Sequence, residues 1–120
     1  MHELSICEAI ARTVADRAAG RRVLAVTVRI GYLRQVVPEA LAFAWEMLTA
    51  TTELEGAALQ IEYVPAVAAC VACGARTTLD APVLACATCV SRAVALQSGE
   101  ELLLVSLETT GEPVRTEEVR

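Results

Sequence analysis

The sequence predicts an α+β protein in which two helices pack against a small three-stranded sheet, with a four-cysteine module inserted before the last strand. Two observations carry this prediction. Apolar residues recur at helical or strand spacing in the order helix, strand, helix, strand, insert, strand. The insert holds four of the five cysteines, in two pairs whose members are two residues apart. A chain of 120 residues suits one ordinary domain with a small appendage.

The first two elements are a helix and a strand. Apolar residues at helical intervals predict an amphipathic helix over residues 4–19, with Gly20 as a stop signal. Cys7 lies on the apolar side of this helix, so we expect it to be a small core residue. From Leu24 to Ile30, apolar residues alternate with other residues, which is the period of a half-buried strand.

The second helix and the last two strands follow after a loop over residues 32–37. Pro38 suits the first turn of a helix, and this helix should end near Thr51. Residues 59–63 alternate again and predict a second strand. Residues 101–108 (ELLLVSLE) are apolar enough to form a strand that is partly buried on both faces.

Composition limits the classes of function. All 10 basic residues are arginine, they are spread along the chain, and the net charge is -5. Nucleic-acid binding needs a concentrated basic face, so we expect no nucleic-acid partner. No apolar run approaches the roughly 20 residues that span a bilayer. The acidic start is also unlike a signal peptide, so we expect a cytoplasmic protein with no membrane partner.

The cysteine module consists of two knuckles, Cys70-Val-Ala-Cys73 and Cys86-Ala-Thr-Cys89, separated by twelve residues that leave room for a hairpin. Four thiolates around one ion are typical of a structural zinc site in a zinc-ribbon domain. Iron in a rubredoxin-like cage uses the same ligands and remains an alternative. Because the insert has few large apolar side chains, we expect Zn(II) to supply most of its folding energy.

The histidine at position 2 is the only one in the chain. A free terminal amine, the amide nitrogen of residue 2 and the imidazole of His2 can close two adjoining chelate rings around one ion. Ni(II) and Cu(II) favour such planar nitrogen environments. The alternative is that His2 is simply solvated at the start of a helix.

A family resemblance favours the metal-binding interpretation. Four segments occur in an order and spacing that resemble the hydrogenase nickel-incorporation proteins, the HypA family: MHELSI, GYLRQVVPEALAFAWE, CVACG followed by CATC, and ELLLVSLE. The resemblance implies a nickel metallochaperone that serves maturation of nickel-iron hydrogenase. It also implies a nickel-binding α+β domain at 1–65 together with 99–112 and a zinc-binding domain at 66–98. The polar composition of the last residues predicts a tail at 113–120.

The same resemblance implies ligands and partners. Transferable Ni(II) is expected at the amine of Met1, at His2 and at the backbone of Glu3. Structural Zn(II) is expected at Cys70, Cys73, Cys86 and Cys89. The implied partners are the nickel-handling GTPase of hydrogenase maturation and the hydrogenase large-subunit precursor.

Two questions stay open at this stage. Certain relatives complete the nickel shell with an aspartate where this chain has Val37, and Glu39 is the nearest carboxylate, although an acidic residue in a first helical turn needs no ligand role. The competing function is a zinc-ribbon scaffold or adaptor for protein assembly with no transferable metal. Neither hypothesis is enzymatic, because the chain has no second histidine, no serine nucleophile elbow and no phosphate-binding glycine loop.

Overall fold

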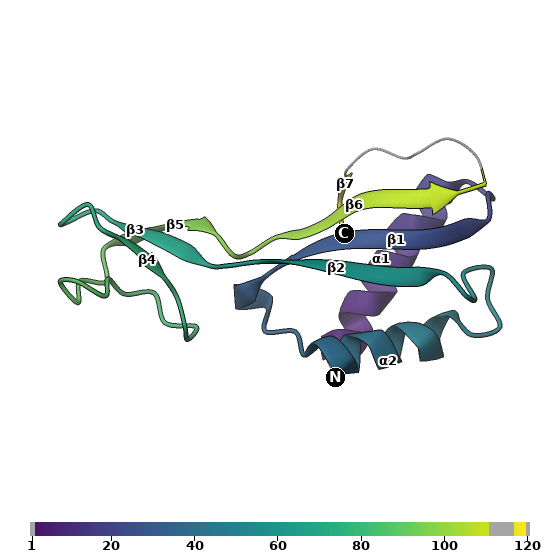
Figure 1. The fold of residues 1–120 in the computed structure, drawn as a ribbon, viewed down its shortest axis with the longest axis horizontal. Helices are drawn as coiled ribbons and strands as arrows, with labels where there is room; N and C mark the ends of the chain where they lie inside the picture. The colour runs from purple at the N-terminus through teal and green to yellow at the C-terminus, as the bar shows by residue number, and fades with distance from the viewer. Residues whose placement is uncertain (1, 111–116, 120) are drawn as a thin grey trace. The chain divides into compact units, whose positions relative to one another are not determined.

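The computed structural model describes residues 2–110 and 117–119, which divide into two compact units (Figure 1). The helix–sheet unit contains the described residues of 1–29, 36–62 and 102–120, and the cysteine unit contains 30–35 and 63–101. Among the described residues, no helix is long and apolar enough to cross a membrane.

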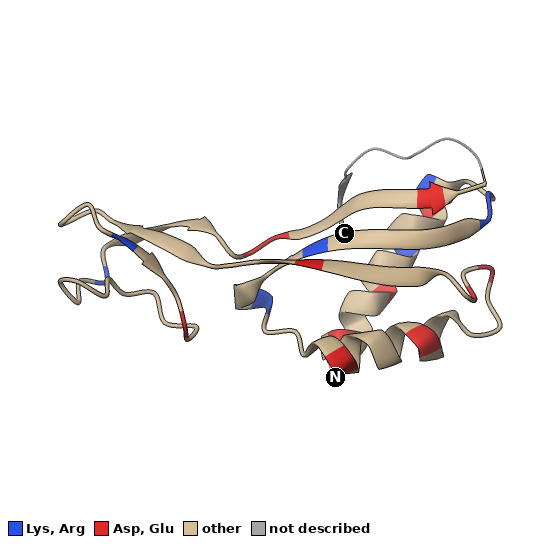
Figure 2. Cartoon of the chain, viewed as in Figure 1, with Lys and Arg blue, Asp and Glu red and all other residues tan. Residues whose placement is uncertain are grey.

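Two helices form one layer of the helix–sheet unit, and both were predicted: α1 (His2–Ala18) and α2 (Pro38–Thr49). Each buries a single stripe of residues three or four positions apart, namely Cys7, Ile10, Val14 and Ala18 in α1 and Leu41, Trp45 and Thr49 in α2. Each also begins with an acidic residue in its first turn, where the positive end of the helix dipole favours it (Figure 2). The helices pack against each other, and α1 packs against β6 (Leu102–Thr109).

The second layer is a sheet with the strand order β2-β1-β6-β7. Its three predicted strands are confirmed as β1 (Val23–Gly31), β2 (Ala58–Val64) and β6. A short fourth strand, β7 (Glu117–Glu118), pairs antiparallel with β6, with Leu103 opposite Glu118. Of the residues 113–120 that the sequence assigns to a polar tail, the structure describes only 117–119.

The sheet has one apolar and one polar face, as the alternation in β1 predicts. Val26 and Val28 are fully buried. Between and beside them, Thr27 donates a hydrogen bond to Gln60 Oε1 at 3.1 Å, and Arg29 pairs with Glu62 at 3.0 Å. These cross-strand pairs occupy the exposed face, so the helices cover the opposite face, and Figure 1 shows α1 crossing behind the strands.

The cysteine unit has its own three-stranded antiparallel sheet with the order β4-β3-β5. The strands are β3 (Val67–Cys70), β4 (Arg76–Thr78) and β5 (Val94–Ser98), and the unit also holds the short 3-10 helix η1 (Tyr32–Arg34). Between the two knuckles, where the spacing leaves room for a hairpin, the structure has the single strand β4. The hairpin is β3–β4, with the first knuckle at its turn, because that knuckle itself reverses the chain.

Two glycines allow chain segments of the cysteine unit to cross closely. The N–H of Gly31 donates to Glu101 O at 2.8 Å, and a Cβ at Gly31 would lie 2.1 Å from the carbonyl of Gly99. Gly99 itself has a φ of +116°, and a Cβ there would lie 2.5 Å from that of Ala66. Both positions therefore exclude a side chain.

Candidate metal-binding sites

The two cysteine knuckles have the same backbone hydrogen bonds. In the first, Cys70 N–H donates to Ala75 O at 2.8 Å and Gly74 N–H donates to Cys70 O at 2.9 Å. In the second, Cys86 N–H donates to Ser91 O at 2.8 Å and Val90 N–H donates to Cys86 O at 3.0 Å. This repeated turn places both sulfurs of a knuckle on the same side of that turn.

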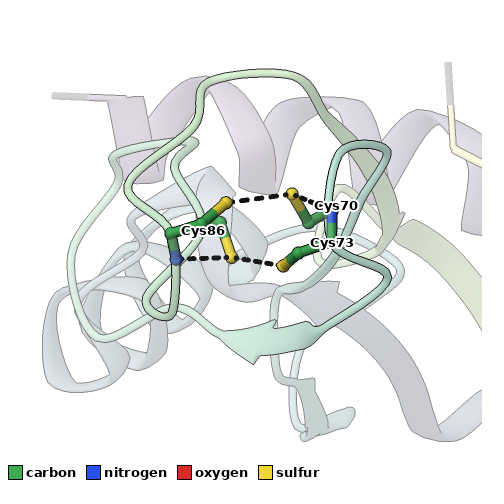
Figure 3. A group of neighbouring side chains, drawn as sticks. Cys70, Cys73 and Cys86 are labelled. Atoms are coloured by element: carbon green, nitrogen blue, oxygen red, sulfur yellow. Dashed lines mark hydrogen bonds between the residues drawn. The ribbon is translucent and has the colours of Figure 1, made fainter.

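The four sulfurs form one cluster. All four lie within 4.8 Å of one another, and the Sγ atoms of Cys70 and Cys89, and of Cys73 and Cys86, are 3.6 Å apart. Figure 3 shows Cys70 and Cys73 on one turn facing Cys86 on the other. In a tetrahedral site with metal–sulfur bonds of about 2.3 Å, the sulfurs would be roughly 3.8 Å apart. The cluster therefore fits a single tetrahedral ion.

Backbone amides stabilise negative charge on the first cysteine of each knuckle, Cys70 and Cys86. Cys73 N–H donates to Cys70 Sγ at 3.4 Å, and the N–H groups of Thr88 and Cys89 donate to Cys86 Sγ at 3.4 and 3.5 Å. The amides of Cys89 and Thr88 lower the pKa of the Cys86 thiol to about 6. The amide of Cys73 lowers the pKa of Cys70 in the same way. Both thiols are thus prepared to bind a metal as thiolates.

The partner sulfur in each opposed pair holds its proton more tightly. At Cys73 the amide of Ala75 acts to lower the pKa, but the sulfur of Cys86, burial and the other sulfurs raise it to about 12. At Cys89 the amide of Ser91 also acts to lower the pKa, but the sulfur of Cys70 and burial raise it. A bound cation would displace the proton from these thiols, because cysteine binds a metal as a thiolate.

The N-terminal candidates lie in the first turn of α1. His2 is the first residue of the helix and Glu3 the second, whereas Met1, the third predicted nickel ligand, lies outside the described residues. His2 Nε2 is 3.6 Å from Glu3 Oε2, and the side chains are 46% and 13% exposed, respectively. The same carboxylate oxygen accepts a hydrogen bond from Val37 N–H at 3.1 Å. That bond, followed by a backbone bond within Glu3 itself, lowers the pKa of the Glu3 carboxyl.

Two other residues were considered as ligands. Glu39 is exposed in the first turn of α2, where its charge suits the helix dipole. Cys7 is fully buried, and its thiol donates to Leu41 O at 3.5 Å. Burial, and then the charge of Glu3, raise the pKa of the Cys7 thiol to about 11. Cys7 therefore stays protonated and apart from the four-cysteine cluster.

Sequence reasoning missed the groups that support these sites. Thr77 Oγ1 accepts the N–H of Ala87 in the second knuckle at 3.1 Å, and the N–H of Val37 binds Glu3 from 34 residues away. No sequence signal marks either contact, because one uses an ordinary strand threonine and the other a backbone amide.

Comparison with known proteins decides the family. The family model for "Hydrogenase/urease nickel incorporation, metallochaperone, hypA" matches residues 1–109. The chain belongs to the HypA family. It is 43% identical over 108 residues to the hydrogenase maturation factor HypA of Geobacter metallireducens, covering 90% of this chain and 98% of that one. It is 39% identical over 111 residues to the HypA of Acidithiobacillus ferrooxidans, with the same coverage.

Solved HypA structures share the fold. The solution structure of the Ni metallochaperone HypA from Helicobacter pylori matches with a TM-score of 0.65 at 23% identity, covering 92% of this chain and 98% of that one. The resemblance stated from the sequence is therefore confirmed. HypA proteins are named as metallochaperones and maturation factors, so this chain belongs to a family of carriers rather than enzymes.

Proposed function

We propose that this chain carries Ni(II) at its N-terminal end and delivers it during maturation of nickel-iron hydrogenase, while Zn(II) holds the four-cysteine cluster together. The observation that carries the proposal is membership of the HypA family over residues 1–109. The nickel ligands are the amine of Met1, the amide nitrogen and imidazole of His2, and the backbone of Glu3.

The two metals have different roles because their sites differ in accessibility. Four cysteines around a tetrahedral ion leave no position for an exchanging ligand, so zinc acts there as a structural ion. His2 is nearly half exposed in the first turn of a helix, so an acceptor can reach nickel bound to it. The proposed partners are the nickel-handling GTPase of hydrogenase maturation and the hydrogenase large-subunit precursor.

The test compares nickel binding by three forms of the full-length protein, with intact mass confirming the first residue. They are the native chain, His2→Ala and the native chain with its terminal amine acetylated. Isothermal titration calorimetry should show nickel affinity lowered by about tenfold or more in both variants, because each loses a nitrogen donor. The chain has no lysine, so acetylation removes the terminal amine without changing any side-chain amine.

The competing function is a scaffold whose cysteine unit binds another protein. Its specific support is that the knuckle residues Val71 and Val90 are 75% and 77% exposed. If acetylation of the terminal amine and His2→Ala both leave nickel affinity unchanged, the terminal chelate is wrong and the scaffold function is favoured.

A further inference from the structure

We infer that the Glu3 side chain is a positioning residue for the nickel site and not a nickel ligand. The inference rests on the proposed function and on two groups that lie beside the carboxylate. One is the backbone N–H of Val37, at the N-terminus of α2, and the other is the imidazole of His2.

The contact with Val37 ties the two helices together at the nickel end. Val37 is the N-cap residue of α2 and has no side-chain oxygen with which to cap the helix. Glu3 Oε2, on α1, accepts the N–H of Val37 itself at 3.1 Å and so fixes the residue that precedes the first turn of α2. The negative charge also lies at the positive end of the α2 dipole. With its side chain only 13% exposed, Glu3 is held between the first turn of α1 and the start of α2.

The contact with His2 determines which imidazole nitrogen is available. A chelate ring closed through the amide nitrogen of residue 2 and the imidazole has six members only if the metal binds Nδ1. The ring nitrogen that faces Glu3 is the other one, Nε2, at 3.6 Å from Glu3 Oε2. A carboxylate beside the distal nitrogen favours the tautomer with the proton on Nε2 and a free Nδ1, which is the usual arrangement behind a metal-bound histidine.

The same oxygen serves both contacts. Binding of Glu3 Oε2 to nickel would compete with both contacts, and loss of the Val37 contact would free the segment before α2. Glu3 therefore contributes backbone atoms to nickel, and its carboxylate orients His2 from behind and fixes the segment before α2.

The experiment compares Glu3→Gln and Glu3→Ala, with Glu8→Gln as a matched control that removes an exposed acidic residue from the same helix. Glutamine keeps an oxygen that can accept the Val37 N–H, whereas alanine does not. In metal-free protein, NMR hydrogen exchange at the Val37 amide should accelerate in Glu3→Ala and stay close to native in Glu3→Gln and Glu8→Gln. Nickel affinity should fall by about tenfold in Glu3→Ala, which is typical of losing a group that orients a ligand, and should be largely restored in Glu3→Gln.

The visible absorption spectrum of bound nickel provides the deciding readout. It should be the same in all variants, because no ligand atom changes. A changed spectrum in Glu3→Gln would show that the carboxylate is a ligand, and unchanged Val37 exchange in Glu3→Ala would show that it does not hold the segment before α2. Either result overturns this inference while the native chain still binds nickel. Failure of the native chain to bind nickel would instead overturn the proposed function.

Discussion

The two units of the molecule bury different kinds of side chain. The helix–sheet unit buries large aliphatic residues to 0–1% exposure, among them Ile10, Val14, Leu41, Leu104 and Leu107. The cysteine unit includes the fully buried Ile30, but between residues 63 and 101 its buried apolar side chains are smaller, apart from one leucine: Ala66, Ala68, Cys70, Leu79 and Cys86. Burying one leucine contributes only about 1.5–3 kcal/mol. The first unit is therefore stabilised by its apolar core, whereas we expect the second, which buries few large side chains, to depend on a bound metal.

Removing the metal should produce the largest effect and should affect only the cysteine unit. Structural zinc contributes roughly 10–16 kcal/mol of apparent folding energy in small domains. Chelation, or Cys86→Ser, should therefore abolish hydrogen-exchange protection in β3 and β5 while α1, β1 and β6 stay protected. Exchange measured by mass spectrometry reports both units at once. Cys7→Ala, which removes the cysteine outside the cluster, should leave the metal content unchanged.

A substitution in the apolar core should, by contrast, weaken only the helix–sheet unit. Leu104 is fully buried, so Leu104→Ala should cost about 2–5 kcal/mol of unfolding free energy. Urea unfolding followed by fluorescence of Trp45, the only tryptophan, reports this unit. The metal content should not change. Leu24 is 47% exposed, so Leu24→Ala provides a control that should change stability by less than about 0.5 kcal/mol. Equal losses of unfolding free energy in Leu104→Ala and Leu24→Ala would contradict an apolar core centred on Leu104.

The same contrast explains which elements the sequence could predict. Helices α1 and α2 and strands β1, β2 and β6 pack against an apolar core, so their burial leaves a periodic pattern that is visible in the sequence. The strands β3, β4 and β5 are only three to five residues long and contain mostly small or polar residues. β7 is a pair of glutamates, which have low strand propensity, so only its pairing with β6 makes it a strand.

The candidate sites also contain some features that the sequence predicts and others that it does not. The spacing of the cysteines predicts the cluster because two short turns bring their own sulfurs together. The Glu3–Val37 bond joins residues 34 positions apart and depends on how α1 packs against α2, so no local pattern indicates it. No sequence pattern predicts the left-handed conformation of Val90 either, because β-branched residues rarely adopt it.

The smallest predicted effect compares the two knuckles within the cysteine unit. Gly74 and Val90 occupy equivalent positions, with φ angles of +78° and +64°. A left-handed conformation costs a residue with a side chain about 1–2 kcal/mol, and glycine largely escapes this cost. Val90→Gly should relieve this strain in the metal-bound state, although added chain freedom in the unfolded unit offsets roughly 0.5–1 kcal/mol of the gain.

A matched variant separates these two contributions. Val71 is as exposed as Val90 but is not in the left-handed region, so Val71→Gly adds the same chain freedom without relieving strain. Competition with a chromophoric chelator should therefore show tighter metal binding by Val90→Gly than by Val71→Gly, by about tenfold for a difference near 1.4 kcal/mol. Gly74→Val should bind more weakly than either, because it introduces the same strain into the first knuckle. Equal affinities of the two valine variants would mean that Val90 stores no strain and that the knuckles contribute equally to holding the metal.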